Sequence, residues 1–73
     1  MTNQEKIAML EDIMELDENT LTENTDLMDI EEWDSLSVLS FMAMLDSIFG
    51  KNLPGSEIRK AKTISDLMKM MEE

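Results

Sequence analysis

A run of mostly apolar residues between positions 36 and 49 is the sequence feature that most constrains the fold of this chain. Asp34 and Ser35 directly precede the run, and residues of both types are common where helices begin. Gly50 directly follows it, and glycine is common where helices end. The run therefore predicts a helix that starts near Ser35 and stops at Gly50.

The apolar arc of this helix is wider than a single buried stripe requires. Leu36 and Leu39 lie outside the stripe, near the start of the helix. We therefore expect them to leave apolar surface exposed beside Ser35. The residues that suit the buried stripe are Val38, Phe41, Met42, Leu45 and Phe49.

Apolar residues at three-and-four spacing predict one more helix near each end of the chain. The first runs from Asn3, which can cap it, to about Leu16. The last follows Thr63, which can cap it together with Asp66 three residues later, and continues to the end. The apolar residues at this spacing are Ile7, Leu10, Ile13 and Met14 in the first helix, and Ile64, Leu67, Met68 and Met71 in the last.

The remaining segments connect these three helices. Residues 17–34 show no sustained period and predict a long loop, and loops of that length in compact domains are often functional. Residues 50–55 are rich in turn-forming Gly, Asn and Pro. Residues 56–61 predict a short third helix led by Glu57, with Ile58 facing inward. We therefore expect an all-α fold, a small four-helix bundle of three main helices plus the short third helix, with a long loop between helices one and two.

The size and composition of the chain limit its function. The chain has 73 residues, and a domain of this size buries only about 60% of the surface that its unfolded chain exposes. We expect residues 1–73 to form one domain. The chain contains no Cys and no His, which removes thiolate nucleophiles, the commonest general base and the commonest transition-metal ligand. These features favour a binding or carrying module, and we expect no enzyme.

The charge of the chain is strongly negative and unevenly distributed. The formal net charge is -11, and residues 1–50 carry thirteen acids against Lys6 alone. Such a surface repels nucleic acid and anionic lipid and attracts basic proteins, although acidity that only maintains solubility is an alternative. The chain lacks a basic leader before a long apolar run, and no stretch approaches the ~20 apolar residues that span a bilayer. We expect a cytoplasmic protein without stable membrane association.

Asp34 and Ser35 form the first candidate site, because the start of a helix favours an anionic group such as a phosphodiester. The alternative is that Asp34 only caps the helix. Serine hydrolase chemistry is excluded by the absence of His and of a Gly-x-Ser-x-Gly elbow. An EF-hand that starts at Asp17 would place Thr22 and Met28 where Gly and Glu are needed. We therefore expect no dedicated metal site.

Residues 33–36 (Trp-Asp-Ser-Leu), followed by a helix that ends at residues 45–50 (Leu-Asp-Ser-Ile-Phe-Gly), resemble the attachment motif of acyl carrier proteins. The resemblance extends over the whole chain. The order and length of the expected helices match that family, including residues 63–67 (Thr-Ile-Ser-Asp-Leu) at the start of the fourth helix.

The resemblance implies that a phosphopantetheinyl transferase moves 4′-phosphopantetheine from coenzyme A onto Ser35, with Asp34 helping to hold the metal ion used in that transfer. The thiol of the arm then carries an acyl or aminoacyl group as a thioester. This agrees with the absence of Cys, since the thiol must be imported. The resemblance further implies a monomer that meets loading and downstream enzymes with basic docking surfaces. It nominates four contact residues, namely Trp33, Leu36, Leu39 and Asp46.

One departure from the family pattern concerns the second helix. Carriers of fatty acid synthesis usually place acids two and five residues after the modified serine, and here those positions are Ser37 and Ser40. We therefore expect a specialised biosynthetic pathway, and we expect acids introduced at both positions to strengthen recognition by fatty acid synthesis enzymes. A peptidyl carrier and a non-carrier acidic helical adaptor that binds a basic protein remain as alternatives.

Overall fold

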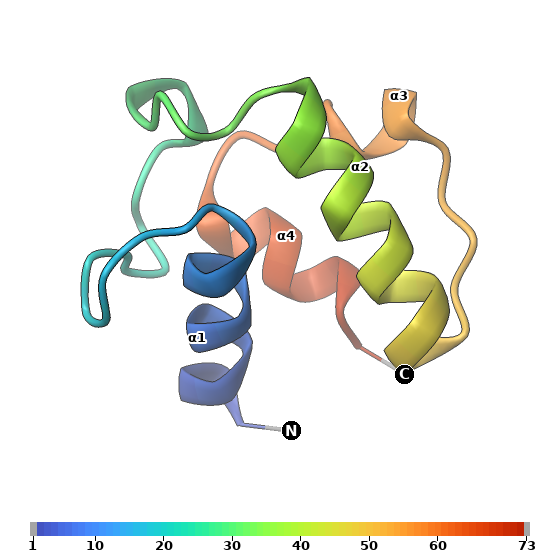
Figure 1. The fold of residues 1–73 in the computed structure, drawn as a ribbon, viewed down its shortest axis with the longest axis horizontal. Coiled ribbons are helices and arrows are strands. Elements are labelled where there is room, and N and C mark those ends of the chain that lie inside the picture. The colour runs from blue at the N-terminus through green and yellow to red at the C-terminus, as the bar shows by residue number, and fades with distance from the viewer. Residues whose placement is uncertain (1, 73) are drawn as a thin grey trace.

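The computed structural model describes residues 2–72, and it confirms the all-α prediction. Four α-helices enclose one core, and in this described part of the chain the only β-type pairing is an isolated bridge between Asp26 and Thr63 (Figure 1). None of these helices has the length and apolar character needed to cross a bilayer. The elements are α1 (Asn3–Ile13), a 3₁₀ turn η1 (Leu27–Asp29), α2 (Ser35–Met44), a π-helical segment η2 (Leu45–Phe49), α3 (Gly55–Ile58) and α4 (Ile64–Met70).

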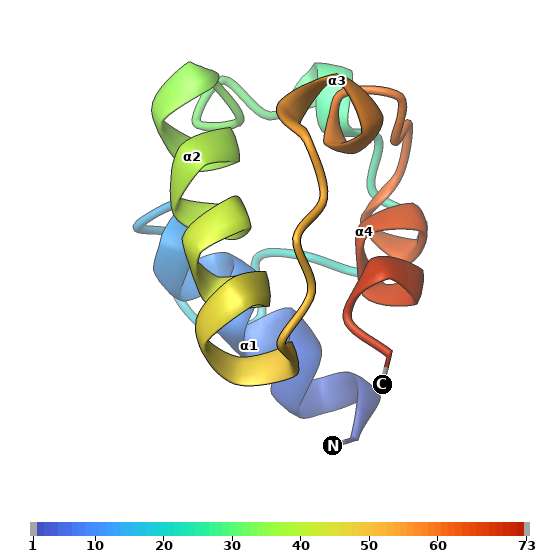
Figure 2. The ribbon, with the colours of Figure 1, turned by 90° about the vertical axis from the view of Figure 1, so that its right-hand side faces the viewer.

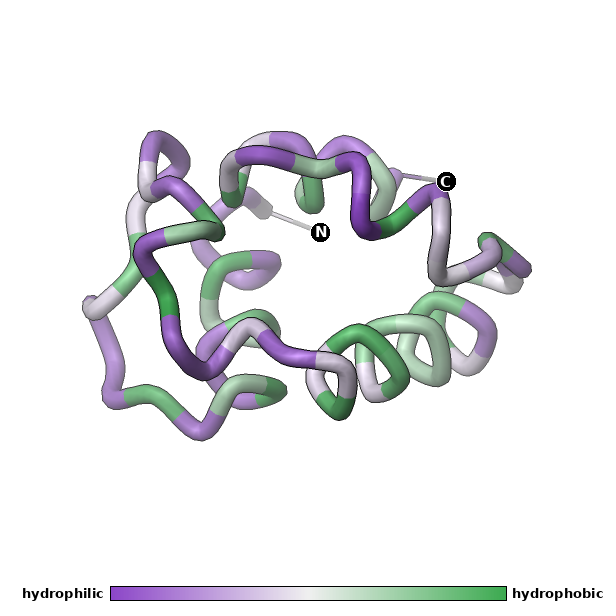
Figure 3. The backbone as a smooth tube through the Cα atoms, turned by 90° about the horizontal axis from the view of Figure 1, so that it is seen from above, coloured by the Kyte–Doolittle hydropathy of each residue, from purple (hydrophilic) through white to green (hydrophobic). Residues whose placement is uncertain are grey.

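The helices are arranged around α2, which packs against both α1 and α3, while α4 packs against α1. Two perpendicular views place the short α3 at the end of the molecule where α2 begins (Figures 1 and 2). The coil of α2 is apolar over much of its circumference, whereas the long loop between α1 and α2 mixes polar and apolar residues (Figure 3). The candidate site at Asp34 and Ser35 therefore lies where the long loop ends, α2 begins and α3 packs against α2.

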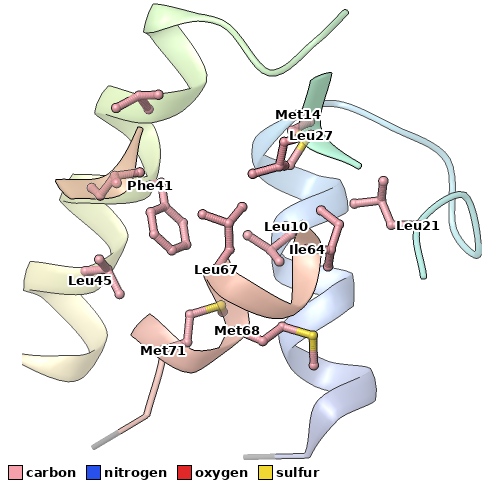
Figure 4. Packing of buried hydrophobic residues seen from close by; sticks show 12 residues of the cluster. Leu10, Met14, Leu21, Leu27, Phe41, Leu45, Ile64, Leu67, Met68 and Met71 are labelled. Carbon is pink, nitrogen blue, oxygen red and sulfur yellow. The ribbon is translucent and has the colours of Figure 1, made fainter. Parts of the chain in front are cut away.

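The core consists of apolar side chains from every helix and from two points of the long loop. Phe41 of α2 and Leu45 of η2 face Leu67 of α4 and Leu10 of α1 (Figure 4). The buried apolar residues are Leu10, Met14, Leu21, Leu27, Val38, Phe41, Leu45, Ile58, Ile64, Leu67, Met68 and Met71. The predicted inward positions of α2 are confirmed except that Met42 and Phe49 are only partly buried at the edge of the core.

The first helix begins and ends at residues other than those predicted. Its N-cap is Thr2, which forms a reciprocal capping box with Glu5, so the predicted cap at Asn3 is wrong. The helix ends at Ile13, three residues before the predicted Leu16. Glu15 adopts a left-handed backbone with φ of 57°, and Leu16 N–H donates to the carbonyl of Glu11 at 2.8 Å. This Schellman-type closure ends the helix without the glycine that usually signals it.

The long loop is held by hydrogen bonds at two points along its course. The buried carboxylate of Glu11 accepts hydrogen bonds from the backbone N–H groups of Thr20 and Leu21, at 2.8 and 3.0 Å. Further along, Leu27 N–H donates to the carbonyl of Lys62, and Ile64 N–H donates to the carbonyl of Thr25. The predicted long loop is therefore confirmed, and hydrogen bonds to α1 and to the residues that begin α4 fix its path.

The last three elements differ from the predictions in detail. The predicted continuous helix to Phe49 becomes π-helical from Leu45 onward, and Gly50 ends it with φ of 65°, as its type predicts. The third helix spans Gly55–Ile58 rather than residues 56–61, and Ile58 is fully buried as predicted. The capping box of Thr63 and Asp66 is confirmed, and α4 ends at Met70.

Candidate functional site

Ser35 is the first residue of α2, and its side chain is exposed. Asp34 is the N-cap, with an extended backbone and a carboxylate oxygen that accepts a hydrogen bond from Ser37 N–H at 3.0 Å. That backbone hydrogen bond holds the pKa of Asp34 below its usual value, so the side chain is anionic at neutral pH. The predicted capping role of Asp34 is therefore confirmed, and it leaves the Ser35 hydroxyl accessible at the start of the helix.

Arg59, at the C-terminal end of α3, contacts the Ser35 side chain. Its Nη2 donates to Ser35 Oγ at 3.3 Å across a separation of 24 residues. Sequence reasoning did not select Arg59, because the contact depends on how α3 packs against α2. The available signal was the burial expected of the neighbouring Ile58, which fixes the face of α3 that remains outside.

A shallow hollow of about 250 Å³ surrounds this contact and is lined by Trp33, Asp34, Ser35, Val38 and Arg59. Trp33 is half-buried, and its ring meets Phe41 edge to face with centroids 6.1 Å apart. The indole therefore anchors the end of the loop to the core, in addition to offering part of its surface to the hollow. Contact between Trp33 and partner enzymes stays a prediction, and it concerns only the exposed part of the indole ring.

The other nominated contact residues are exposed and lie along α2 and its extension. Leu36 and Leu39 are 71% and 60% exposed, which confirms the expected apolar surface beside Ser35. Asp46 is exposed on η2, at the far end of the same helical rod. Met28 of η1, in the long loop, is 95% exposed.

Ser37 and Ser40 differ in their surroundings. Ser37 is buried at 6% exposure, and its Oγ donates to the carbonyl of Glu32 at 2.5 Å. Ser40 is exposed one turn later. The expectation that both positions offer surface for a partner's charge is therefore wrong for Ser37, whose hydroxyl ties the loop to α2.

The arrangement around Ser35 does not support hydrolysis. Asp34 is committed to the helix cap, and the residue that contacts the hydroxyl is the cation Arg59, which cannot act as a general base. Within residues 2–72, no three carboxylates are grouped closely enough to hold a metal ion. What the arrangement offers is an accessible hydroxyl at the positive end of a helix with a guanidinium beside it.

Comparisons with known proteins agree with this geometry. The sequence model of the family described as "Phosphopantetheine attachment site" matches residues 7–71. An acyl carrier protein of Lactobacillus acidophilus is 34% identical over 58 residues, a stretch that covers 80% of this chain and 72% of that protein. No solved structure matched the chain.

Proposed function

Because the chain belongs to the family of phosphopantetheine-binding acyl carrier proteins, whose members carry 4′-phosphopantetheine covalently, we propose that Ser35 is the residue that bears the arm. The family transports cargo between enzymes and does not itself catalyse reactions on it. The observation that supports Ser35 is its position, since it is an exposed hydroxyl in the first turn of α2 with Arg59 Nη2 at 3.3 Å. The chain has no Cys and therefore no thiol of its own, and the arm would supply one.

The residues around Ser35 fit a phosphodiester. The N-terminal end of a helix and a guanidinium both favour a negatively charged oxygen. The neighbouring hydroxyl of Ser37 is a poor alternative because it is buried and already donates to the carbonyl of Glu32. Ser40 is exposed, but it lies inside the helix, away from the free N–H groups of the first turn.

In the loading reaction, Ser35 Oγ would lose its proton and attack the phosphorus of coenzyme A that bears the pantetheine. The pyrophosphate P–O bond at that phosphorus would break, and adenosine 3′,5′-bisphosphate would leave. Asp34 is exposed and anionic beside that oxygen, which supports its proposed role in holding the metal ion that the transferase uses. Arg59 Nη2 lies 3.3 Å from the same oxygen.

The proposed partners are enzymes of a specialised pathway with basic, partly apolar docking surfaces. Leu36 and Leu39 supply exposed apolar area next to the arm, and Asp46 supplies a charge farther along the helix. Ser40 is at an exposed position, and α2 itself carries no acidic residue. This supports partners that recognise carriers with less charge than those of fatty acid synthesis.

Loading by a phosphopantetheinyl transferase tests the proposal. Coexpression followed by intact-mass measurement is expected to show one phosphopantetheinyl group on the wild type and on Ser40→Ala, and none on Ser35→Ala. Circular dichroism checks that both variants are folded. A wild type that remains unmodified with a broadly specific transferase would instead support the adaptor function.

A further inference from the structure

Arg59 makes a loose contact with the free hydroxyl of Ser35. The distance of 3.3 Å from Nη2 to Oγ is slightly longer than is usual for an N–H···O hydrogen bond. A guanidinium has five N–H donors in a rigid planar fork, and a single hydroxyl oxygen uses one of them. The other N–H donors of the Arg59 guanidinium could therefore bind a ligand with more oxygen atoms at this position.

A phosphodiester on Ser35 provides those oxygens. Esterification replaces the hydroxyl hydrogen with phosphorus, which brings two non-bridging oxygens and one negative charge next to Oγ. The planar fork of arginine matches such a pair of oxygens better than a lysine ammonium does. We propose that Arg59 binds the phosphodiester at the base of the arm and thereby restricts its orientation, an inference that rests on the proposed attachment at Ser35.

The core holds Arg59 in the required place. Ile58, its neighbour in the chain, is fully buried. At the other end of α3, a Cβ on Gly55 would lie 3.7 Å from both Val38 Cγ1 and Met42 Sδ, so the helix rests closely on α2. Both views show α3 beside the start of α2 (Figures 1 and 2). The guanidinium is therefore presented to Ser35 by packing that does not depend on the arm.

The negative charges around Ser35 would favour a cation beside the phosphodiester. A phosphodiester adds a negative charge next to Asp34 in a chain whose net charge is already -11. The positively charged Arg59 contacts Ser35 Oγ, whereas the adjacent Lys60 forms an ion pair with Glu57 at 3.0 Å. Because the site is exposed, the pair is screened by salt and contributes little to global stability. Its effect is on the direction in which the arm leaves the surface.

Nuclear magnetic resonance of the loaded protein tests the inference without an activity assay. Intact mass first establishes loading of the wild type, Arg59→Gln, Arg59→Lys and the control Lys62→Gln, which removes a charge from an exposed side chain outside the hollow. The ³¹P resonance of the phosphodiester is then compared among the four proteins. The guanidinium ¹H–¹⁵N signal of Arg59 is compared between apo and loaded wild type, which needs no variant.

We expect loading to shift the Arg59 guanidinium signal, and we expect that shift to shrink at high salt. The ³¹P resonance should move in Arg59→Gln, move less in Arg59→Lys, and coincide with the wild type in Lys62→Gln. A guanidinium signal that loading leaves unchanged, with coincident ³¹P resonances in wild type and Arg59→Gln, overturns this inference alone. A wild type that acquires no group at Ser35 overturns the proposed function and the inference with it.

Discussion

Removal of the Glu11 carboxylate should disturb the path of the long loop more than any other single substitution. Glu11 is 5% exposed and accepts two backbone hydrogen bonds, from Thr20 at 2.8 Å and from Leu21 at 3.0 Å. In Glu11→Ala both N–H groups lose their partner. Leu21 is itself buried, so water replaces that bond poorly, whereas Thr20 is exposed and regains part of its hydration.

The expected loss follows from these two bonds. A hydrogen bond to a charged group is worth about 1.5–3 kcal/mol, and the exposed one is discounted, which gives about 3 kcal/mol in total. A 73-residue domain has a total unfolding free energy of roughly 4–11 kcal/mol at about 0.05–0.15 kcal/mol per residue. The melting temperature should therefore fall by roughly 12–24 °C, since each kcal/mol corresponds to about 4–8 °C in a domain of this size.

Urea denaturation and thermal scans followed by circular dichroism measure this loss. Asp12→Ala is the matched control, because it removes the same charge from an exposed neighbour on α1. Glu11→Gln, which keeps one acceptor oxygen, should lie between the two. If Glu11→Ala and Asp12→Ala have the same unfolding free energy within about 0.5 kcal/mol, the usual range for exposed substitutions, then Glu11 does not anchor the loop.

Three further predictions concern stability. Ser37→Asp should destabilise the protein in urea denaturation, because the side chain is buried and the new carboxylate cannot donate to the carbonyl of Glu32, whereas Ser40→Asp should be close to neutral; equal midpoints would contradict the assignment. Asp66 accepts hydrogen bonds from the backbone N–H groups of Lys62 and Thr63, which lower its pKa. Its contribution to stability is therefore present above about pH 4 and is lost as the pH falls through its folded-state pKa. Asp66→Asn should flatten the acid limb of the melting-temperature profile, and an unchanged limb would contradict this. Added salt or magnesium should raise the melting temperature by screening a net charge of -11, and indifference to both would show that charge repulsion is not significant.

Local signals predicted the parts of the fold that depend on neighbouring residues. Three features each follow from residue types within one helical turn: the start of α2 at Ser35, the end of η2 at Gly50, and the capping box of Thr63 with Asp66. The end of α1 was missed because Glu15 adopts a left-handed backbone that favours Gly or Asn, so its residue type gave no signal.

Long-range contacts account for the other differences. Glu11 is one acid among many in the sequence, and only the folded chain shows that its carboxylate receives two N–H groups of the loop. Ser37 has the residue type of a surface position, but the loop covers it. Arg59 reaches Ser35 because the buried Ile58 fixes α3 on α2. The partners of Glu11 and Arg59 lie too far along the chain for periodicity or capping rules to identify them, and that of Arg59 is 24 residues away. The partner of Ser37 is only five residues away, but it lies in the loop, where no helical period applies.

The position of the modified residue tests the central proposal most directly. The wild-type protein is loaded with a phosphopantetheinyl transferase and coenzyme A and then digested, and the peptide that contains Ser35, Ser37 and Ser40 is fragmented in a mass spectrometer. We predict that the fragments place the phosphopantetheinyl group on Ser35 alone. Fragments that place the group on Ser37, on Ser40 or on a different peptide would contradict the proposal.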